Sequence, residues 1–568
     1  MSNTSFNIEE IKTKNMMDTV KVNGFFLHSK FDPIIESIRF VDKNYKGKRL
    51  HILFGYGLGY IVEEFSKRLV NNERLIVIEP IFNIEKCELK NVQIINIKGK
   101  ENHSVEKLLK NIIGSTDMVT FCCSPNYDKV CMDTYKEVFS TIKRNIYIQF
   151  VNENTINFMA KEWQRNYLYN IQNALKGNSL KKLEKVTDCP IVIASGGPSL
   201  TKQIPLIEKY RNKMILISSG STINTLLKFN IEPDYAISID SQEVNYNHFK
   251  DLYLKNTSLI YHMYNHYGIP ESFKKTSYYF LGITDSHFQK HLQNITDEEV
   301  PLIAGGASVA NYALSIASYI TNGPIALIGQ DLAYTNNQTH AEANKHFKQL
   351  NDEEIRRKRY TSAEGYYGDQ VVTDYPFLSM KQNFENLKEY FVDNDVSNCT
   401  EGGIKLDGFT QIPFQEFCEK NMTTPSDIVL EDQSLKYSNK ELISKIKEDI
   451  VIVEKINKLS SENLKMLKSN TNHFKFSFNV LRSLDKNDEK ILELESKSPV
   501  NIIMGPVNLR ILKSFAPPKN ETKKEAYLRI FKQNELLYSK YAEACEDTKV
   551  FLENLISRIE GEQNESNY

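Results

Sequence analysis

No stretch of this sequence is apolar for long enough to cross a bilayer, so no transmembrane helix is predicted. Net charge is nearly absent too, because 71 lysines and arginines are balanced by 72 aspartates and glutamates. Such a chain lacks the excess of basic residues that general nucleic-acid binding and acidic membrane surfaces require. We therefore expect neither nucleic acid nor a membrane among its partners.

Paired cysteines are missing as well. The eight cysteines include no CxxC pair and follow no regular framework, which favours free thiols in a reducing compartment. The polar, acidic start MSNTSFNIEE does not resemble a secretory signal peptide. No clear DxD motif or His/Cys cluster suggests a metal. These absences predict a cytoplasmic protein that needs no metal, and 568 residues allow more than one domain.

The most informative stretch follows Pro190. Residues 191–194 (IVIA) form an apolar run typical of a buried parallel strand, and the sequence SGGPS then ends it. The segment from Leu200 to Tyr210 has the pattern of an amphipathic helix. A glycine turn that leads into a helix directs N–H groups at one place, where phosphate commonly binds. A turn without a ligand is the alternative, and no Walker A loop is present because no Gly-Lys-Ser/Thr follows.

Polar residues also follow the next two predicted strands. The strand 213–217 precedes the hydroxyl-rich turn SSGST at 218–222, and the strand 235–239 precedes Asp240 and Ser241. The carboxyl ends of parallel strands share one edge of the sheet, where open α/β folds bind ligands. The convergence of three such ends predicts a ligand that carries a phosphate or a nucleotide.

Two later segments extend this pattern. The turn at Gly305 and Gly306 opens a helix rich in small residues, which can lie close to a sheet. The buried strand 324–329 is followed by QDLAY and by a polar loop that carries His340 and His346. Long polar loops positioned by a buried strand are common places for catalytic groups.

The region before residue 150 predicts a smaller α/β domain. It begins with a strand, the loop Gly55–Gly59, a helix and a second strand that ends at Glu79. This order resembles the opening of a Rossmann unit, in which an acidic residue meets a ribose. Taken alone it suggests a site for NAD or S-adenosylmethionine, although similar turns also occur without a ligand. Further strands are predicted at 92–97, 118–122 and 145–150, and a helix at 152–183.

Three domains are therefore expected, at 1–150, 151–412 and 413–568. The first two are α/β domains, whereas the last is rich in Lys and Glu and helical in pattern, with another helix predicted at 523–559. The helical domain could dock an acceptor, support homo-oligomerisation or serve as a structural cap, and the sequence does not decide among these roles.

Several motifs between Leu50 and Phe409 resemble those of the Maf family, the motility-associated flagellin glycosyltransferases. They are ILFGYGLGY, IVIEP, ASGGPSL, SSGSTIN, PDYAISID, GGASVANYALSIA, IALIGQDLAY, THA and TEGGIKLDG. The resemblance implies a central domain similar to bacterial sialyltransferases, a variant of the GT-A fold. It also implies transfer of a nonulosonic acid, of the pseudaminic or legionaminic type, from a CMP-activated donor to Ser/Thr of flagellin. No cofactor beyond the donor is implied.

The resemblance further implies which residues form the site. The donor-binding set comprises Ser195, Gly196, Gly197, Pro198, Ser199, Ser219, Gly220, Ser221, Asp240, Ala304, Gly305, Gly306 and Ser308. The catalytic candidates are His340, Asp331 and Tyr334. His340 suits the base by its residue type rather than by the resemblance, and an ordinary loop histidine is the alternative. The sialyltransferase tyrosine would fall at Ala333, one residue before Tyr334, and the catalytic histidine of those enzymes comes later in the chain than His340. Asp331 could orient a ligand hydroxyl, act as the base itself or cap the next turn, so the identity of the base stays open.

Two other functions are compatible with the sequence. A related domain occurs in archaeal pterin diphosphokinases, so an ATP-dependent pyrophosphokinase is one alternative; it would require Mg²⁺ and a cluster of carboxylates at the strand ends. The other is a non-catalytic factor that binds flagellin and keeps a vestigial nucleotide pocket.

Overall fold

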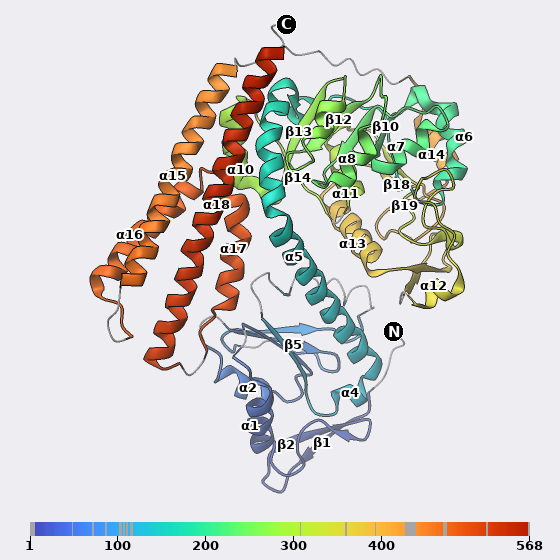
Figure 1. Ribbon diagram of the computed structural model, residues 1–568. Coiled ribbons are helices and arrows are strands. Elements are labelled where there is room, and N and C mark those ends of the chain that lie inside the picture. Colours follow the sequence, from blue (N-terminus) through green and yellow to red (C-terminus); the bar gives the residue numbers. More distant parts are fainter. Residues whose placement is uncertain are drawn as a thin grey trace. The chain divides into compact units, whose positions relative to one another are not determined.

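The computed structural model describes residues 6–47, 49–70, 73–85, 88–100, 105, 108–109, 112–113, 118–306, 308–357, 360–391, 394–425, 439–469, 474–518 and 521–565. The chain forms two compact units (Figure 1). The first unit comprises Met1–Phe158, His473–Lys475 and Asn508–Gln533, and the second comprises Met159–Asn472, Phe476–Val507 and Asn534–Tyr568. Within the described ranges, no helix has the length and apolar character needed to span a membrane.

The first unit contains a four-stranded parallel sheet in the order β6-β5-β4-β7 and a small antiparallel sheet, β1-β2-β3. Its strands are β1 (Ile8–Lys12), β2 (Asp18–Val22), β3 (Phe25–Phe26), β4 (Leu50–Phe54), β5 (Arg74–Glu79), β6 (Val92–Asn96) and β7 (Val119–Cys123). Its helices are α1 (Pro33–Asn44), α2 (Tyr60–Ser66), α4 (Tyr127–Val130) and the first part of α5 (Met132–Lys176). The strands predicted at 92–97 and 118–122 are confirmed as β6 and β7.

The strand predicted at 145–150 is wrong, because these residues lie inside α5. The segment is rich in isoleucine and tyrosine, which favour strands. Its buried neighbours are instead Val138, Ile142 and Asn145, which recur at intervals of three and four residues. That spacing places them on one face of a helix, so packing against the rest of the unit decides the structure. The helix predicted to begin at 152 therefore begins at Met132 and ends at Lys176.

The second unit is built on a ten-stranded sheet. Its main path is β14-β13-β12-β11-β10-β9-β15-β18-β19, β8 pairs with β13, and every pair is parallel. The strands are β8 (Asn178–Ser179), β9 (Ile191–Ala194), β10 (Ile215–Ser219), β11 (Tyr235–Ser238), β12 (Ser258–His262), β13 (Ser277–Gly282), β14 (Leu302–Ile303), β15 (Ile325–Ile328), β18 (Val396–Asn398) and β19 (Thr410–Gln411).

Strand β9 lies at the centre of this sheet and is covered on both faces. Ile191 and Ile193 pack in the cluster that contains α11 (Val309–Ile320) and part of α13 (Tyr375–Tyr390). Val192 and Ala194 face the opposite cluster, with α6 (Leu200–Tyr210) and α14 (Phe414–Asn421). This double burial explains why the strand is uninterruptedly apolar in sequence. Strand order reverses between β9 and β15, because successive strands extend from β9 in one direction and from β15 in the other.

Further elements belong wholly or in part to the second unit. They are α7 (Gly220–Leu227), α8 (Glu243–Phe249), α9 (Gly268–Ser272), α10 (Ser286–Thr296), α12 (Asp352–Arg357), the hairpin β16 (Thr361–Glu364) and β17 (Gln370–Thr373), α15 (Asn439–Ser469), α16 (Phe478–Glu495), α17 (Asn501–Ser514) and α18 (Lys523–Glu565). The end of α17 and the start of α18 lie in Asn508–Gln533, which is part of the first unit. Helix α15 packs on α10, where His291 Nε2 contacts Asp449 Oδ2 at 3.1 Å. The predicted helical C-terminal region is confirmed, whereas the domain boundaries at 150 and 412 stay a prediction.

Candidate functional site

A cavity of about 330 Å³ lies in the second unit, where the strand order reverses. Its floor comes from the residues that leave three neighbouring strands: 195–198 after β9, 219–222 at the end of β10 and 329–333 after β15. The N-terminus of α11 and the first two turns of α13 complete the lining, together with His248, Thr339 and His340. Ligands of open α/β folds bind at this kind of crevice, outside the carboxyl ends of the strands.

The loop after β9 contains two glycines because it packs closely against neighbouring loops, with no room for a side chain. Gly197 N–H donates to the carbonyl of Gly329 at 2.9 Å, which joins the loops after β9 and β15. A Cβ at Gly197 would collide with the Asp331 carboxylate, and one at Gly196 would lie 2.9 Å from Thr222 Oγ1. By contrast, the Cβ position of Gly220 faces open space. Strand β10 extends to Ser219, beyond the predicted end at 217, because Ser218 and Ser219 still pair with β11.

Asp331 joins the loops around the cavity. Its Oδ2 accepts from Ser199 Oγ at 2.6 Å, and its Oδ1 accepts from Thr335 Oγ1 at 2.7 Å; the Ser199 N–H donates to the same carboxylate. Burial raises the pKa of Asp331, and these hydrogen bonds oppose the rise. Because its oxygens are engaged by the chain itself, Asp331 has the geometry of a positioning residue, the capping role that the sequence left open beside ligand binding.

Several predicted site residues lie outside the cavity lining. Tyr334 points its hydroxyl at Asp374 Oδ2 (2.8 Å), and its ring contacts Phe377, with centroids 5.4 Å apart. Asp240 is exposed at the end of β11. A Cβ at Gly305 would overlap the ring of Tyr312, so packing alone accounts for that glycine. Ala307 of the same turn lies outside the described residues.

Some of the predicted site residues line the cavity, and others do not. The predicted residues that line the cavity are Ser195, Gly196, Gly197, Pro198, Ser219, Gly220, Ser221, Ser308, Asp331 and His340. The predicted residues that do not line it are Ser199, Asp240, Ala304, Gly305, Gly306 and Tyr334.

Sequence reasoning missed other lining residues, among them Thr222, His248, Gln330, Thr339, Phe377 and Met380. Thr222 and Gln330 lie in polar turns that the sequence had singled out, so that signal was available. His248 is on α8, and Phe377 and Met380 are on α13; nothing in their local sequence distinguishes them from packing residues.

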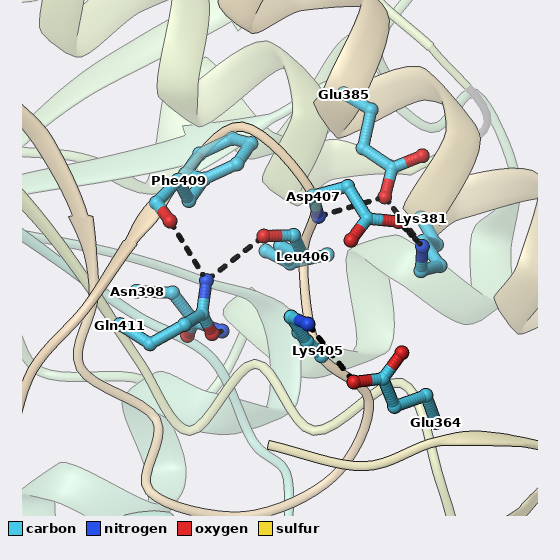
Figure 2. Close-up of polar contacts among 9 residues, drawn as sticks. All are labelled: Glu364, Lys381, Glu385, Asn398, Lys405, Leu406, Asp407, Phe409 and Gln411. Carbon is cyan, nitrogen blue, oxygen red and sulfur yellow. Dashed lines mark hydrogen bonds and ion pairs between the residues drawn. The ribbon is translucent and has the colours of Figure 1, made fainter. Parts of the chain in front are cut away.

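A network of ion pairs holds α13, the helix that lines one side of the cavity (Figure 2). Lys381 of α13 contacts Glu385 at 2.5 Å and Asp407 at 2.9 Å, and Glu385 also accepts from the N–H of Asp407. Nearby, Lys405 pairs with Glu364 of β16 at 2.9 Å. The segment 405–407 is thereby tied both to α13 and to the hairpin β16–β17. These contacts hold in place the helix whose first two turns line the cavity.

The cavity is lined by hydroxyl-bearing residues and two histidines. None of the described lining residues is a lysine or an arginine. Within the described ranges, no group of three or more His, Cys, Asp or Glu side chains could hold a metal ion. Hydroxyls and helix N-termini suit a phosphate group.

The glycine loop of the first unit has a different environment. The three successive N–H groups of residues 56–58 donate in turn to Glu79 Oε2 (2.6 Å), the Tyr127 hydroxyl (2.8 Å) and His28 Nε2 (2.8 Å). In a dinucleotide-binding loop, such N–H groups face the pyrophosphate. In the loop Gly55–Gly59, side chains of the protein itself take the place that a pyrophosphate would have.

Glu79, which the sequence predicted to meet a ribose, is fully buried. It also accepts from the Tyr127 hydroxyl at 2.9 Å and from the N–H groups of Ile81 and Phe82. A Cβ at Gly57 would overlap the His28 ring, so the loop lies flat against that side chain. The residues present therefore do not fit NAD or S-adenosylmethionine at this loop.

Comparisons with known proteins agree with this architecture. A family model described as "6-hydroxymethylpterin diphosphokinase MptE-like" matches residues 165–337, less than half of the chain. The solved Maf glycosyltransferase of Magnetospirillum magneticum AMB-1 is similar over 97% of this chain and 93% of its own, at 13% identity and a TM-score of 0.53. No curated protein matches the chain. The chain thus has the fold of that Maf glycosyltransferase, and the predicted fold class is confirmed.

Proposed function

We propose that this protein is a cytoplasmic glycosyltransferase that moves a nonulosonic acid, of the pseudaminic or legionaminic type, from a CMP-activated donor to Ser/Thr of flagellin. The observation that carries the proposal is the cavity at the strand-order reversal, which is lined by several hydroxyl-bearing residues and two histidines. The fold shared with a Maf glycosyltransferase and the sequence motifs give further support.

In the proposed reaction, the acceptor oxygen forms a bond to the anomeric carbon of the sugar. The bond from that carbon to the phosphate oxygen breaks, and its electron pair stays on CMP. The transition state resembles an oxocarbenium ion, so charge accumulates on the leaving phosphate. Ser219 and Ser221 line the cavity at the N-terminus of α7 and are placed to donate to that phosphate, whereas the Ser195 hydroxyl donates to Gln330 Oε1 at 2.6 Å.

The acceptor hydroxyl must lose its proton during this reaction, which requires a neutral base. Burial is the largest cause that lowers the pKa of His340, so its imidazole is neutral near pH 7. His340 lines the same cavity as the serines. We assign it the role of general base, and Asp331 the role of holding the loops in place.

A pyrophosphokinase is the second candidate, because the matching family model carries that description. Transfer of a diphosphate from ATP would require Mg²⁺, which proteins bind mainly through carboxylates. The described part of the cavity has one carboxylate, Asp331, and its oxygens already accept from Ser199 and Thr335. This arrangement favours the glycosyltransferase. A flagellin-binding factor without catalysis is the third candidate.

Ligand binding by the purified full-length protein separates these candidates. We expect CMP to bind, and ATP with Mg²⁺ to bind far more weakly, in calorimetric titrations. The variant Ser219→Ala removes a lining hydroxyl that makes no capping hydrogen bond to α7, and should weaken CMP binding several-fold. Ser140→Ala, an exposed position on α5, is the matched control and should bind CMP like the wild type. Preference for ATP with Mg²⁺ would support the kinase, and absence of any nucleotide binding would support the binding factor.

A further inference from the structure

Three imidazoles gather at one side of the cavity. His340 and His248 both line it, although they come from the loop after β15 and from α8. The ring of His346 lies 5.8 Å from that of His340 and 5.4 Å from that of His248, measured between centroids. A Cβ at Gly196 would lie 3.9 Å from Cδ2 of His340, so this imidazole packs against the glycine loop.

These rings have unused hydrogen-bonding capacity. Nδ1 of His248 and Nδ1 of His340 are shielded from solvent, and neither has a hydrogen-bond partner among the described residues. Buried polar atoms normally find partners. Two unpartnered nitrogens on side chains that line the cavity therefore point to an interaction that a ligand completes.

Burial and the neighbouring groups lower the pKa of His248 and of His340, so both rings are neutral near pH 7 when no anion is present. For His248, burial lowers the pKa, Lys345 and His346 lower it further, and the carboxylate of Asp240 opposes them. For His340, burial and His346 lower the pKa, and a hydrogen bond to the His346 backbone opposes them. Asp331, the remaining titratable group in the lining, is engaged with Ser199 and Thr335.

We propose that His248, His340 and His346 form a proton store, which receives the acceptor's proton and keeps it as the counter-charge of the leaving phosphate. This inference rests on the proposed function. The donor phosphate is a diester with one negative charge, whereas released CMP carries nearly two near neutral pH. Since no lysine or arginine is among the described lining residues, a protonated imidazole is the cation available next to the new charge.

The proposed step conserves atoms and charge. The acceptor O–H bond breaks and its proton moves to His340, while the C–O(P) bond breaks and its electron pair remains on the phosphate. The imidazolium and the phosphate dianion appear together, and the neighbouring rings share the positive charge. The same cluster thus serves as base for the acceptor and as stabiliser for the leaving group.

The proton store predicts that CMP binding takes up a proton. Calorimetric titration of the full-length protein with CMP, at about pH 7.5 in two buffers of different ionisation enthalpy, measures this uptake. We expect about one proton per CMP, and therefore an affinity that falls about tenfold per pH unit between roughly pH 7 and 8. The variants His340→Gln and His248→Gln should each reduce the uptake. The ³¹P chemical shift of bound CMP should remain that of a dianion at about pH 6, where free CMP is half protonated.

Other outcomes would overturn the inference. CMP binding without proton uptake, or with uptake that both variants retain, contradicts the proton store. So does a bound phosphate that titrates like free CMP, because the phosphate itself would then carry the proton. Failure of CMP to bind at any pH would instead contradict the proposed function, so the two failures are distinguishable.

Discussion

Mild acid should loosen the glycine loop of the first unit, because His28 holds that loop in its neutral form. Its Nε2 accepts from the N–H of Leu58 at 2.8 Å, which a doubly protonated ring cannot do. Burial lowers the pKa of His28 from 6.5 to about 4. Protonation would therefore break the hydrogen bond and place a charge next to a buried loop.

The sign and size of the effect follow from proton linkage. Below pH 6.5 the unfolded chain protonates His28, whereas the folded protein does not until about pH 4. The stability associated with neutral His28 is thus complete above pH 6.5 and is lost as the pH falls through this window, by about 3 kcal/mol in total. Glu79 acts in the opposite direction, because burial raises its pKa and the folded state gains a proton first.

The variant His28→Gln isolates the contribution of His28, since its amide oxygen can accept from Leu58 but does not titrate. Hydrogen exchange at residues 56–58, corrected for the intrinsic effect of pH, reports local opening directly. In the wild type, the opening free energy should fall between pH 7 and 5 by about 2 kcal/mol; in the variant it should change much less. An equal fall in both proteins, or none in the wild type, would refute the assignment to His28.

Further predictions concern the supports of the site and the first unit. Asp331→Ala should lower the midpoint of urea unfolding and weaken CMP binding, since Ser199 and Thr335 lose a buried acceptor worth about 1–3 kcal/mol; unchanged CMP affinity would contradict its positioning role. Lys381→Met removes two ion pairs beside α13 and should increase hydrogen exchange in the segment 405–407, whereas exchange at the wild-type rate would show that the network does not hold it. NAD and S-adenosylmethionine should not bind in equilibrium dialysis, because Glu79 and its neighbours fill the loop; stoichiometric binding of either would show that the loop opens.

The parts of the site that the sequence predicted are those in which local chemistry determines structure. The apolar run of β9, the glycine turn after it and the helix from Leu200 to Tyr210 form as predicted, because burial, turn geometry and amphipathic spacing agree there. The ends of β10 and β15 also carry the predicted polar residues, although β10 extends two residues beyond its predicted end. A parallel sheet brings such ends to one edge, so their convergence could be predicted without knowledge of the strand order.

The parts that the sequence did not predict depend on contacts between distant segments. His248 reaches the cavity only because α8 follows β11 beside β10, and no local pattern marks it. Gly305 has a packing reason that becomes visible only with Tyr312 in place. The loop at Gly55–Gly59 has the spacing of a nucleotide site, yet Tyr127, 70 residues further on from Gly57, fills it. Spacing within a motif cannot reveal an occupant supplied by another part of the chain.

The most direct test of the central claim is transfer itself. Purified full-length protein, incubated with a CMP-activated nonulosonic acid and unmodified flagellin, should release CMP and increase the intact mass of flagellin by whole sugar residues. His340→Gln should lose about two orders of magnitude in rate or more, because a general base contributes that much. A flagellin mass that stays unchanged while the donor remains intact, with protein that binds CMP, would contradict the assignment of this chain as a flagellin glycosyltransferase.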